Sequence, residues 1–243
     1  MRLRITILLV LALPLNAEES QDDAITPVLP LTHPVLTDTT FDWKPALSQS
    51  MRFLLVEHGF RLAVQPMTRK RLGGPFLSDY ADSVKALRGW GDGDNWFINY
   101  VAHPMQGAMS GYIQVQNDRE GRNLEFSNDK RYWRSRLKAL AWNAAYSTQF
   151  EVGPISESSL GNVGQRKGTS GYVDLVVTPT GGFAVMLAED ALDRYLVKKW
   201  ESRTTSLRMR GVYRVALNPC RAFANVLRGK SPWFRDARPI DAP

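Results

Sequence analysis

The residues best suited to chemistry in this chain are uncharged polar side chains that recur at helical spacing. Asn99, His103 and Gln106 follow one another at intervals of four and three residues, so a helix would place them on one face. Similar stripes of amides and hydroxyls occur near Ser147 and Asn225. A water-facing helix would carry Lys and Glu instead, so the pattern predicts that several stripes face inward. The candidate polar cluster comprises Asn99, His103, Asn143, Ser147, Glu151, Glu157, Asp174, Thr178, Asn218, Arg221 and Asn225.

Three interpretations of this cluster stay open from the sequence. Buried polar groups must be hydrogen-bonded, since each unpaired group costs about 1–3 kcal/mol. A connected network would therefore fix the register of the helices, and it would also serve to line a ligand or catalytic cleft. In the third interpretation the stripes face water. If the network is buried, we expect Asp174 to pair with Arg221 or Arg228.

A catalytic interpretation centres on His103. An imidazole beside a carboxylate is suited to general acid–base catalysis, and the nearest candidates are Glu151, Glu157 and Asp174. An envelope hydrolase or transferase would use such a group. Glu151 and Glu157 also offer two carboxylates in one loop, and a glycan-cleaving pair needs carboxyl groups about 5–10 Å apart. Two acids in a loop are more often simply solvated.

Several motifs of known chemistry are absent. The sequence contains no His-Glu-x-x-His zinc helix, no Gly-x-Ser-x-Gly elbow and no phosphate-binding loop. The histidines are His33, His58 and His103, and their spacing suits no standard metal site, so we predict no metal or cofactor. The single cysteine, Cys220, excludes an internal disulfide. A buried, unreactive thiol is favoured over a nucleophile, because no histidine neighbours it in sequence.

Three proline motifs share one pattern. His103-Pro104, Thr178-Pro179 and Asn218-Pro219 each follow two apolar residues and precede a Gly or Ala three positions after the proline. Proline removes an amide donor and clashes with the carbonyl four residues back. The motifs therefore predict kinked helices or helix starts, with a small residue that lets a second helix approach closely.

Apolar residues at helical spacing predict an all-α fold. We expect a single compact bundle of about six helices over residues 42–230, several of them bent at proline. Asp42 and Asp129 are predicted helix caps. The segment 172–185 is less certain in type, because its run of valines followed by Thr-Pro-Thr-Gly-Gly also fits a strand, a turn and a strand. We favour a helix there.

The start of the chain predicts export. Basic residues at positions 2 and 4 precede an apolar stretch of about 11 residues, which is too short to span a bilayer and typical of a signal peptide. We place the signal peptide at 1–17 with cleavage after Ala17, a flexible lead-in at 18–41 and a C-terminal tail at 231–243. The predicted location is the periplasm or the outer membrane. A lipid anchor is not expected, because no cysteine lies near the cleavage site.

The charge is concentrated near the C-terminus. The formal charge of +7 falls to +5 without Arg2 and Arg4, and residues 194–238 contain twelve Lys or Arg against two acids. This predicts a basic surface for an anionic membrane or another envelope component. Nucleic acid is a poor partner for an exported chain. The stretches 95–117 and 172–188 are long enough to enter a bilayer, but their amides and Asp174 argue against full spanning.

Four motifs together carry a resemblance to a known family. They are Asn99-Tyr100-Val101-Ala102-His103-Pro104-x-x-Gly107, Glu151-x-Gly153-Pro154-x-Ser156-Glu157, Asp174-x-x-x-Thr178-Pro179-x-Gly181-Gly182 and Asn218-Pro219-x-Arg221-x-Phe223-x-Asn225. In these motifs residues 90–228 resemble an uncharacterised family of exported bacterial envelope proteins, known by a domain-of-unknown-function label. The resemblance implies an envelope location and supplies no activity.

Overall fold

The computed structural model describes residues 41–161 and 171–240, and most of these residues lie in helices. The predicted signal peptide and nearly all of the lead-in lie outside them, so cleavage and export stay predictions. In the described ranges the only β-pairing is an isolated bridge between Phe41 and Asp118. The all-α prediction is confirmed. The segment after Tyr172 is a helix, so its alternative as two strands is wrong.

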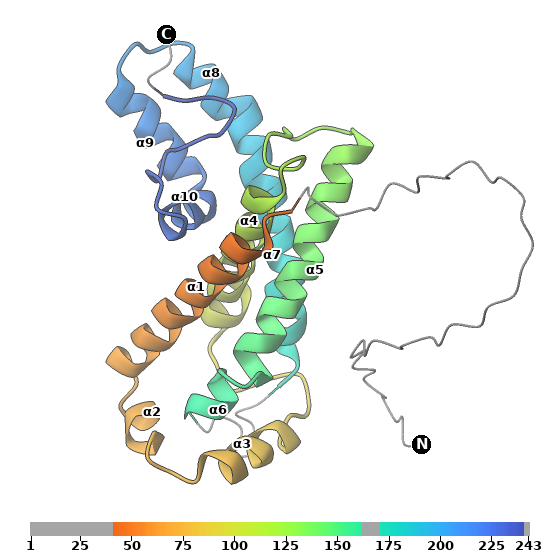
Figure 1. Cartoon of the computed structure of the whole chain (residues 1–243), viewed down its shortest axis with the longest axis vertical. Helices are drawn as coiled ribbons and strands as arrows, with labels where there is room; N and C mark the ends of the chain where they lie inside the picture. Colours follow the sequence, from red (N-terminus) through yellow and green to blue (C-terminus); the bar gives the residue numbers. More distant parts are fainter. Residues whose placement is uncertain (1–40, 162–170, 241–243) are drawn as a thin grey trace, which may run out of the picture. The chain divides into compact units, whose positions relative to one another are not determined.

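The helices are shorter and more broken than the sequence suggested (Figure 1). The predicted count of about six is not confirmed; near the C-terminus, for example, two short helices meet at Asn218, whose backbone leaves the helical region. The α-helices are α1 (Trp43–Val64), α2 (Pro66–Arg71), α3 (Phe76–Lys85), α4 (His103–Asn117), α5 (Lys130–Val152), α6 (Glu157–Gly161), α7 (Val173–Leu192), α8 (Lys198–Glu201), α9 (Leu207–Leu217) and α10 (Pro219–Leu227). Two wider π-helical turns, η1 (Ile98–Ala102) and η2 (Asp193–Val197), lead into α4 and join α7 to α8.

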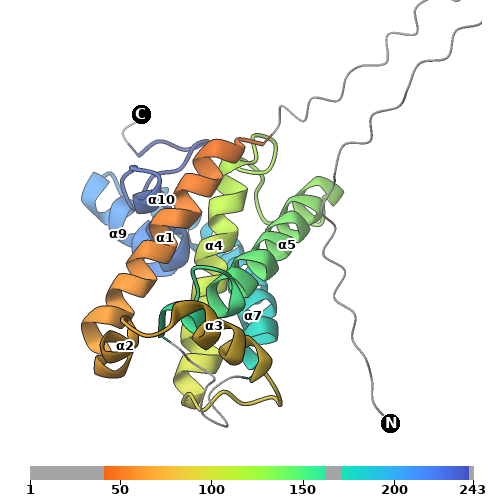
Figure 2. The same ribbon diagram turned by 60° about the horizontal axis from the view of Figure 1, so that its bottom comes forward.

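Helices α4, α5 and α7 pack together in the middle of this unit, and α1 and α10 pack against α4 (Figures 1 and 2). Glycines set the distance between α4 and α7. A Cβ atom on Gly107 would lie 2.0 Å from the Thr178 carbonyl oxygen, and one on Gly182 would lie 2.6 Å from the Gly107 Cα atom. Side chains cannot fit there. The expectation that small residues after the prolines allow close helix approach is therefore confirmed for this pair.

The three prolines occupy two kinds of position. Pro219 lies in the first turn of α10, after the break at Asn218, where the missing amide donor costs nothing. Pro104 is the second residue of α4, but η1 runs into α4 without a break, so Pro104 lies within a continuous helical segment. Pro179 lies inside α7, where the nearby Thr180 hydroxyl donates a 2.6 Å hydrogen bond to the Val176 carbonyl oxygen. The motifs thus give one helix start and two prolines inside helical segments.

The two predicted caps differ. The Asp129 side chain accepts a 2.8 Å hydrogen bond from the Arg131 amide and so caps α5. Asp42 precedes α1, but its carboxylate pairs with Arg119 instead, and Asp42 makes no capping hydrogen bond.

Helix α7 continues through η2 and α8, and the whole segment Val173–Glu201 is long and apolar enough to cross a membrane. It is the only such helix in the ranges that the structure describes. Length and composition are weak evidence for a membrane span, because the core helix of a soluble protein shares them. This segment packs against both α4 and α5 and holds five buried acids, Asp174, Glu189, Asp190, Asp193 and Glu201. Buried acids argue against full spanning of a bilayer.

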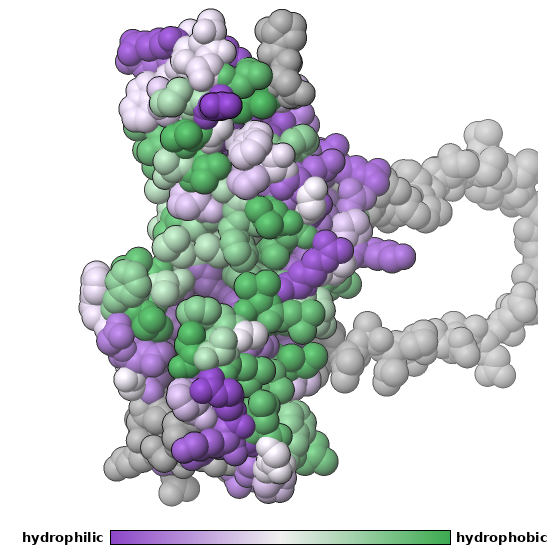
Figure 3. Space-filling model, turned by 90° about the vertical axis from the view of Figure 1, so that its left-hand side faces the viewer, coloured by the Kyte–Doolittle hydropathy of each residue, from purple (hydrophilic) through white to green (hydrophobic). Residues whose placement is uncertain are grey.

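Large apolar side chains are exposed on the face that Figure 3 shows, which is the side of Figure 1 where α1, α2 and α9 lie. Leu47, Met51 and Leu55 follow one another at intervals of one helical turn along α1, and all three are exposed. Leu207 and Val212 are exposed on α9. Surfaces this apolar mark contact with a membrane or another molecule.

Candidate functional site

The structure divides the predicted polar residues between two places. His103, Ser147, Glu151, Glu157, Asp174 and Thr178 gather where α4 and α7 begin, whereas Asn218, Arg221 and Asn225 contact the far ends of the same helices. Helix α4 alone separates them by about 20 Å. Asn143 lies between, where it accepts a 2.8 Å hydrogen bond from Ser110. The prediction of one connected polar centre is therefore wrong.

We call the first group the acid–histidine cluster, and its centre is His103. The His103 Nδ1 atom lies 2.8 Å from the Gln106 Oε1 atom. Because an amide oxygen only accepts, Nδ1 donates this hydrogen bond, and Nε2 is the ring nitrogen that faces the carboxyl groups. Nε2 points toward the Asp174 Oδ1 atom at 3.6 Å, which is too long for a hydrogen bond.

Glu151 completes a group of three. One ligand atom from each of His103, Glu151 and Asp174 lies within 4.8 Å of the other two. The Asp174 Oδ1 and Glu151 Oε1 atoms are shielded from solvent, and neither has a hydrogen-bond partner among the residues that the structure describes. Three groups able to bind a cation thus face one another without a donor between them.

Three helices position this group. His103 begins α4 directly after the π-helical turn η1, where its amide donates to the Ile98 carbonyl oxygen five residues back. Asp174 lies in the first turn of α7. Ser147 on α5 donates a 3.0 Å hydrogen bond to the Asp174 carbonyl oxygen, and Glu151 lies one turn further along α5. The Ser147 hydrogen bond therefore sets the position of α5, and with it Glu151, relative to the start of α7.

More acids surround the three. Glu157 on α6 pairs with Arg61 on α1, with 2.7 Å between the Arg61 Nε and Glu157 Oε1 atoms. Asp92, in the turn before η1, accepts a 3.0 Å hydrogen bond from Asn99. Glu57 accepts a 2.6 Å hydrogen bond from the Tyr146 hydroxyl. Among the described residues, one arginine, Arg61, faces six carboxyl groups in this cluster. The six are Glu57, Asp92, Asp94, Glu151, Glu157 and Asp174.

Most of these carboxyl groups hold their protons more tightly than usual. Burial raises the pKa of Asp174 to about 9 and that of Glu57 to about 8. Burial and the neighbouring acids also raise the pKa of Glu151 and Glu157. Burial opposes ionisation of Asp92 too, yet hydrogen bonds from Asp174, the Asp94 amide and Asn99 hold the pKa of Asp92 below its ordinary value. Negative charge is in excess here, and a bound proton or cation relieves it.

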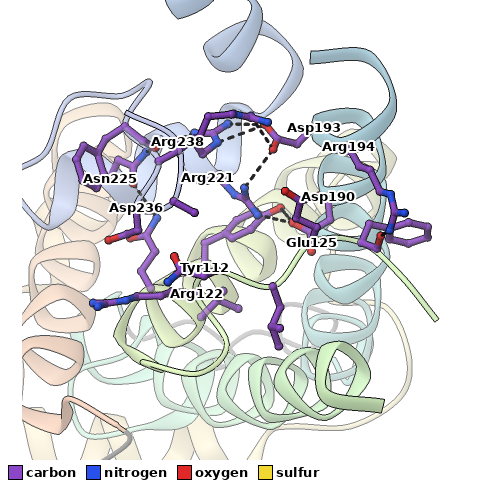
Figure 4. Close-up of a pocket in the computed structure, with 18 of the residues that line it drawn as sticks. Tyr112, Arg122, Glu125, Asp190, Asp193, Arg194, Arg221, Asn225, Asp236 and Arg238 are labelled. Atoms are coloured by element: carbon purple, nitrogen blue, oxygen red, sulfur yellow. Dashed lines mark hydrogen bonds and ion pairs between the residues drawn. The ribbon is translucent and has the colours of Figure 1, made fainter. Parts of the chain in front are cut away.

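The second group is an arginine cluster, made of Arg136, Asp190, Asp193, Glu201, Arg214, Arg221, Arg228, Arg235, Asp236 and Arg238. Figure 4 shows the part of it around Asp190, Asp193 and Arg221. Arg221 pairs with Asp190 in this cluster, and Arg228 pairs with Asp236 at 2.8 Å. The predicted pairing of Asp174 with either arginine is wrong. Asp174 lies in the first turn of α7, whereas the two arginines lie near its last turn, where Asp190 is.

Asp190 is the best-partnered carboxylate in the cluster. It accepts hydrogen bonds from Arg136 at 2.7 Å, from the Tyr132 hydroxyl at 2.9 Å and from the Tyr112 hydroxyl at 3.1 Å. Burial alone would raise its pKa, but Arg136 and Arg221 lower the pKa below its ordinary value. A fully ionised, fully partnered acid holds structure together and has no free oxygen for chemistry.

The remaining predicted residues of this end anchor the C-terminal residues. Asn225 donates hydrogen bonds to the carbonyl oxygens of Pro232 and Phe234 at 2.9 and 3.0 Å. Asn218 donates to the Glu189 carbonyl oxygen at 2.9 Å and accepts from Arg235 at 2.6 Å. These contacts join residues 231–240 to the helices.

Sequence reasoning missed Arg61, Glu57 and Asp92 as members of the acid–histidine cluster. Asp92 lies in the turn before η1, and Glu57 and Arg61 lie on α1, far along the chain from His103. Glu57 and Arg61 are four residues apart on α1 and flank the buried His58, so they were the available signal.

Comparison with known proteins returned no matching family model, no matching curated protein and no matching solved structure.

Proposed function

We propose that this chain is an exported, envelope-associated helical protein whose working centre is a divalent-cation site formed by His103, Glu151 and Asp174. The observation that carries the proposal is the group of three ligand atoms within 4.8 Å, two of them buried carboxylate oxygens without a partner among the described residues. Ions such as Zn²⁺ bind imidazole nitrogen and carboxylate oxygen at about 2.1 Å, so tetrahedral ligand atoms lie about 3.4 Å apart. The separation of 3.6 Å between His103 and Asp174 fits that spacing.

The surroundings support an imidazole ligand. The hydrogen bond from His103 Nδ1 to Gln106 fixes the ring and leaves Nε2 as the donor atom, which is the usual arrangement behind a metal-bound histidine. The excess of carboxyl groups supplies the charge that a divalent cation neutralises. Zn²⁺ and Mn²⁺ suit one nitrogen and two oxygens.

Three protein ligands would leave a position on the cation for water, and the cation would then supply the chemistry of hydrolysis. Glu157, held by Arg61, is close enough to influence Glu151 and is the candidate proton acceptor. The proposal is therefore a metal-dependent envelope hydrolase, with a purely structural metal centre as the alternative.

Metal binding tests the proposal directly. The full chain, stripped with chelator and equilibrated with Zn²⁺ or Mn²⁺, should retain about one ion, measured by mass spectrometry of the eluted metal. His103→Ala and Asp174→Asn should each weaken binding by about 100-fold or more, since even outer-shell changes cost about 10–100-fold. His58→Gln is the matched control, because His58 is equally buried and its Nε2 atom faces the Ile155 carbonyl oxygen.

Two results separate the outcomes. Equal metal retention by the wild type, the His103 variant and the His58 variant would sink the site. Specific binding without metal-dependent cleavage of chromogenic phosphodiester, ester or peptide substrates would leave a structural centre in place of a hydrolase.

A second candidate function, docking on an anionic lipid surface, is favoured by α9. Leu207, Met209 and Val212 are exposed on this helix, and Arg203 and Arg208 are exposed beside them. Apolar side chains flanked by arginines are typical of helices that lie in the membrane interface. The predicted basic C-terminal surface is smaller than its composition suggests, because Arg214 and Arg235 are buried in ion pairs.

Vesicle sedimentation tests the docking. The full chain should bind vesicles that contain phosphatidylglycerol and should be partly released by high salt, which screens the arginine contribution. Val212→Ser should weaken binding, whereas Leu137→Ser, at an equally exposed leucine on α5, should not. Equal binding by both variants would exclude α9 as the docking helix.

A further inference from the structure

A cavity of about 160 Å³ lies beside the arginine cluster (Figure 4). Residues from α4, the loop after it, η2, α10 and the C-terminal segment line it, and Tyr112 and Arg221 lie among them in the close-up. One water molecule occupies about 30 Å³ of liquid, so the cavity has room for several waters or one small polyatomic anion.

Positive charge exceeds negative charge around this cavity. Arginines outnumber the carboxylates that they contact, so the carboxylates are shared. Asp193 contacts Arg221, Arg235 and Arg238, and Asp190 contacts two arginines. Burial and the neighbouring arginines lower the pKa of Arg235 to about 10. Crowded guanidinium groups of this kind are stabilised by an additional anion.

Two polar atoms at the cavity lack partners in the described part of the chain. Gln116 is 7% exposed, and its Oε1 atom has no hydrogen bond, while its Nε2 atom donates to Asn225 at 3.0 Å. The Arg228 Nε atom is also buried without an acceptor. Both side chains line the cavity, so its wall contains one donor and one acceptor without a partner among the described residues.

We infer that this cavity is a binding site for a phosphate group. Guanidinium groups bind phosphate oxygens through paired, charge-assisted hydrogen bonds, and Arg228 and Arg221 line the cavity from α10. The hydroxyl of a phosphate monoanion donates to Gln116. The site is independent of the proposed metal centre, which lies at the other end of α4.

Inorganic phosphate is the first probe. Added to the full chain at constant ionic strength, it should raise the melting temperature more than chloride does, because a ligand that binds only the folded state stabilises it. Arg228→Gln should weaken phosphate binding about tenfold, the effect of losing one charge-assisted hydrogen bond. Arg131→Gln is the control, since Arg131 pairs with Asp129 at the start of α5 and does not line the cavity.

Two further variants and a competition experiment check the site and identify the source of the phosphate. Gln116→Leu removes the unpaired acceptor without touching an ion pair, so it should weaken phosphate binding even if Arg228→Gln folds poorly. Asp174→Asn should keep the phosphate effect, which separates this site from the metal centre. Competition by phosphate against phosphatidylglycerol vesicles assigns the site to a lipid headgroup, and phosphate binding without competition assigns it to a free phosphate. No difference between phosphate and chloride, or equal binding by wild type, Arg228→Gln and Gln116→Leu, overturns the inference.

Discussion

Helices α4 and α7 carry a charged cluster at each end, and the two clusters solve the problem of buried charge in opposite ways. At the arginine end, Asp190 is ionised and surrounded by donors, and its pKa is lowered. At the acid–histidine end, Asp174 has an unpartnered oxygen and a pKa raised to about 9. Both aspartates are almost fully buried on the same helix.

The contrast teaches that burial alone does not distinguish a structural polar residue from a functional one. Asp190 accepts hydrogen bonds from four side chains, so its role is to stabilise the fold. Its removal would leave the arginines that face it buried without an acid. A buried carboxyl without donors must hold a proton or a cation. The count of donors around each acid therefore separates the two roles, and the first two predictions test this separation.

The largest effect is expected from a matched pair of substitutions. Asp190→Asn leaves Arg136 and Arg221 without their shared acid, and breaking a buried ion pair costs about 3–5 kcal/mol in the free energy of unfolding. Asp174→Asn, measured at neutral pH without added metal, replaces a protonated carboxyl with a group of the same shape, so its change should stay below about 1 kcal/mol. Urea denaturation of the two variants measures both values.

The same pair can break the comparison. If Asp174→Asn destabilises the metal-free protein as much as Asp190→Asn does, Asp174 is ionised and partnered, and the two ends do not differ in kind. A large loss that appears for Asp174→Asn only when Zn²⁺ or Mn²⁺ is present would instead strengthen the contrast.

The second prediction concerns pH. Burial raises the pKa of Glu57 from 4.5 to about 8, so the folded state binds this proton more tightly than the unfolded chain. Its contribution to stability is complete below about pH 4.5 and is lost as pH rises through about 8. The free energy of unfolding of the wild type should therefore decrease between pH 5 and 9. In Glu57→Gln this decrease should be smaller by about 2–4 kcal/mol, measured by urea denaturation across that range.

The arginine cluster should set how stability changes on the acid side of the same pH range. Asp190 and Asp193 have lower pKa values in the folded state than in the unfolded chain. They therefore contribute stability at pH values above the unfolded pKa, and this stability is lost as pH falls through the folded pKa. Glu57→Gln should leave the acid limb unchanged. A variant that shifts both limbs equally would show that the two clusters titrate as one unit.

Much of this fold could be predicted from the sequence, because helical spacing and small residues act locally. The spacing of Asn99, His103 and Gln106 placed them on one inward face, and all three are buried. The glycines after Pro104 and Pro179 indicated close helix contact, and Gly107 and Gly182 make it. These features depend on neighbours within a turn or two along the chain.

The division into two clusters could not be predicted, because it depends on how far apart residues on different helices lie. Asp174 and Arg221 have complementary charge, and the sequence offered no measure of the length of α7 between Asp174 and Asp190. The sequence grouped His103 with Glu151 and Asp174 as candidates for acid–base chemistry, but it could not show that the three lie close enough to share a cation. His103, Glu151 and Asp174 come from three helices, and their spacing along the chain matches no local motif.

The smallest effect is expected at the contact between the two clusters, where Gly107 and Gly182 hold α4 against α7. A Cβ on Gly182 would lie 2.6 Å from the Gly107 Cα atom, so Gly182→Ala must push the helices apart and should cost about 1–3 kcal/mol. Gly59→Ala is the control, because no atom lies within 4 Å of a Cβ at that helical position, and alanine there should stabilise by up to about 1 kcal/mol.

The Gly182 variant also tests whether the two ends are coupled through the α4–α7 contact. Separation of the helices should move Asp174 away from His103 and Asp190 away from Tyr112, so Gly182→Ala should weaken both metal binding and phosphate binding. Titration of each ligand against wild type, Gly182→Ala and Gly59→Ala measures this. If only one of the two affinities changes, the close glycine contact positions one cluster alone, and the other end is held by α5 or α10 instead.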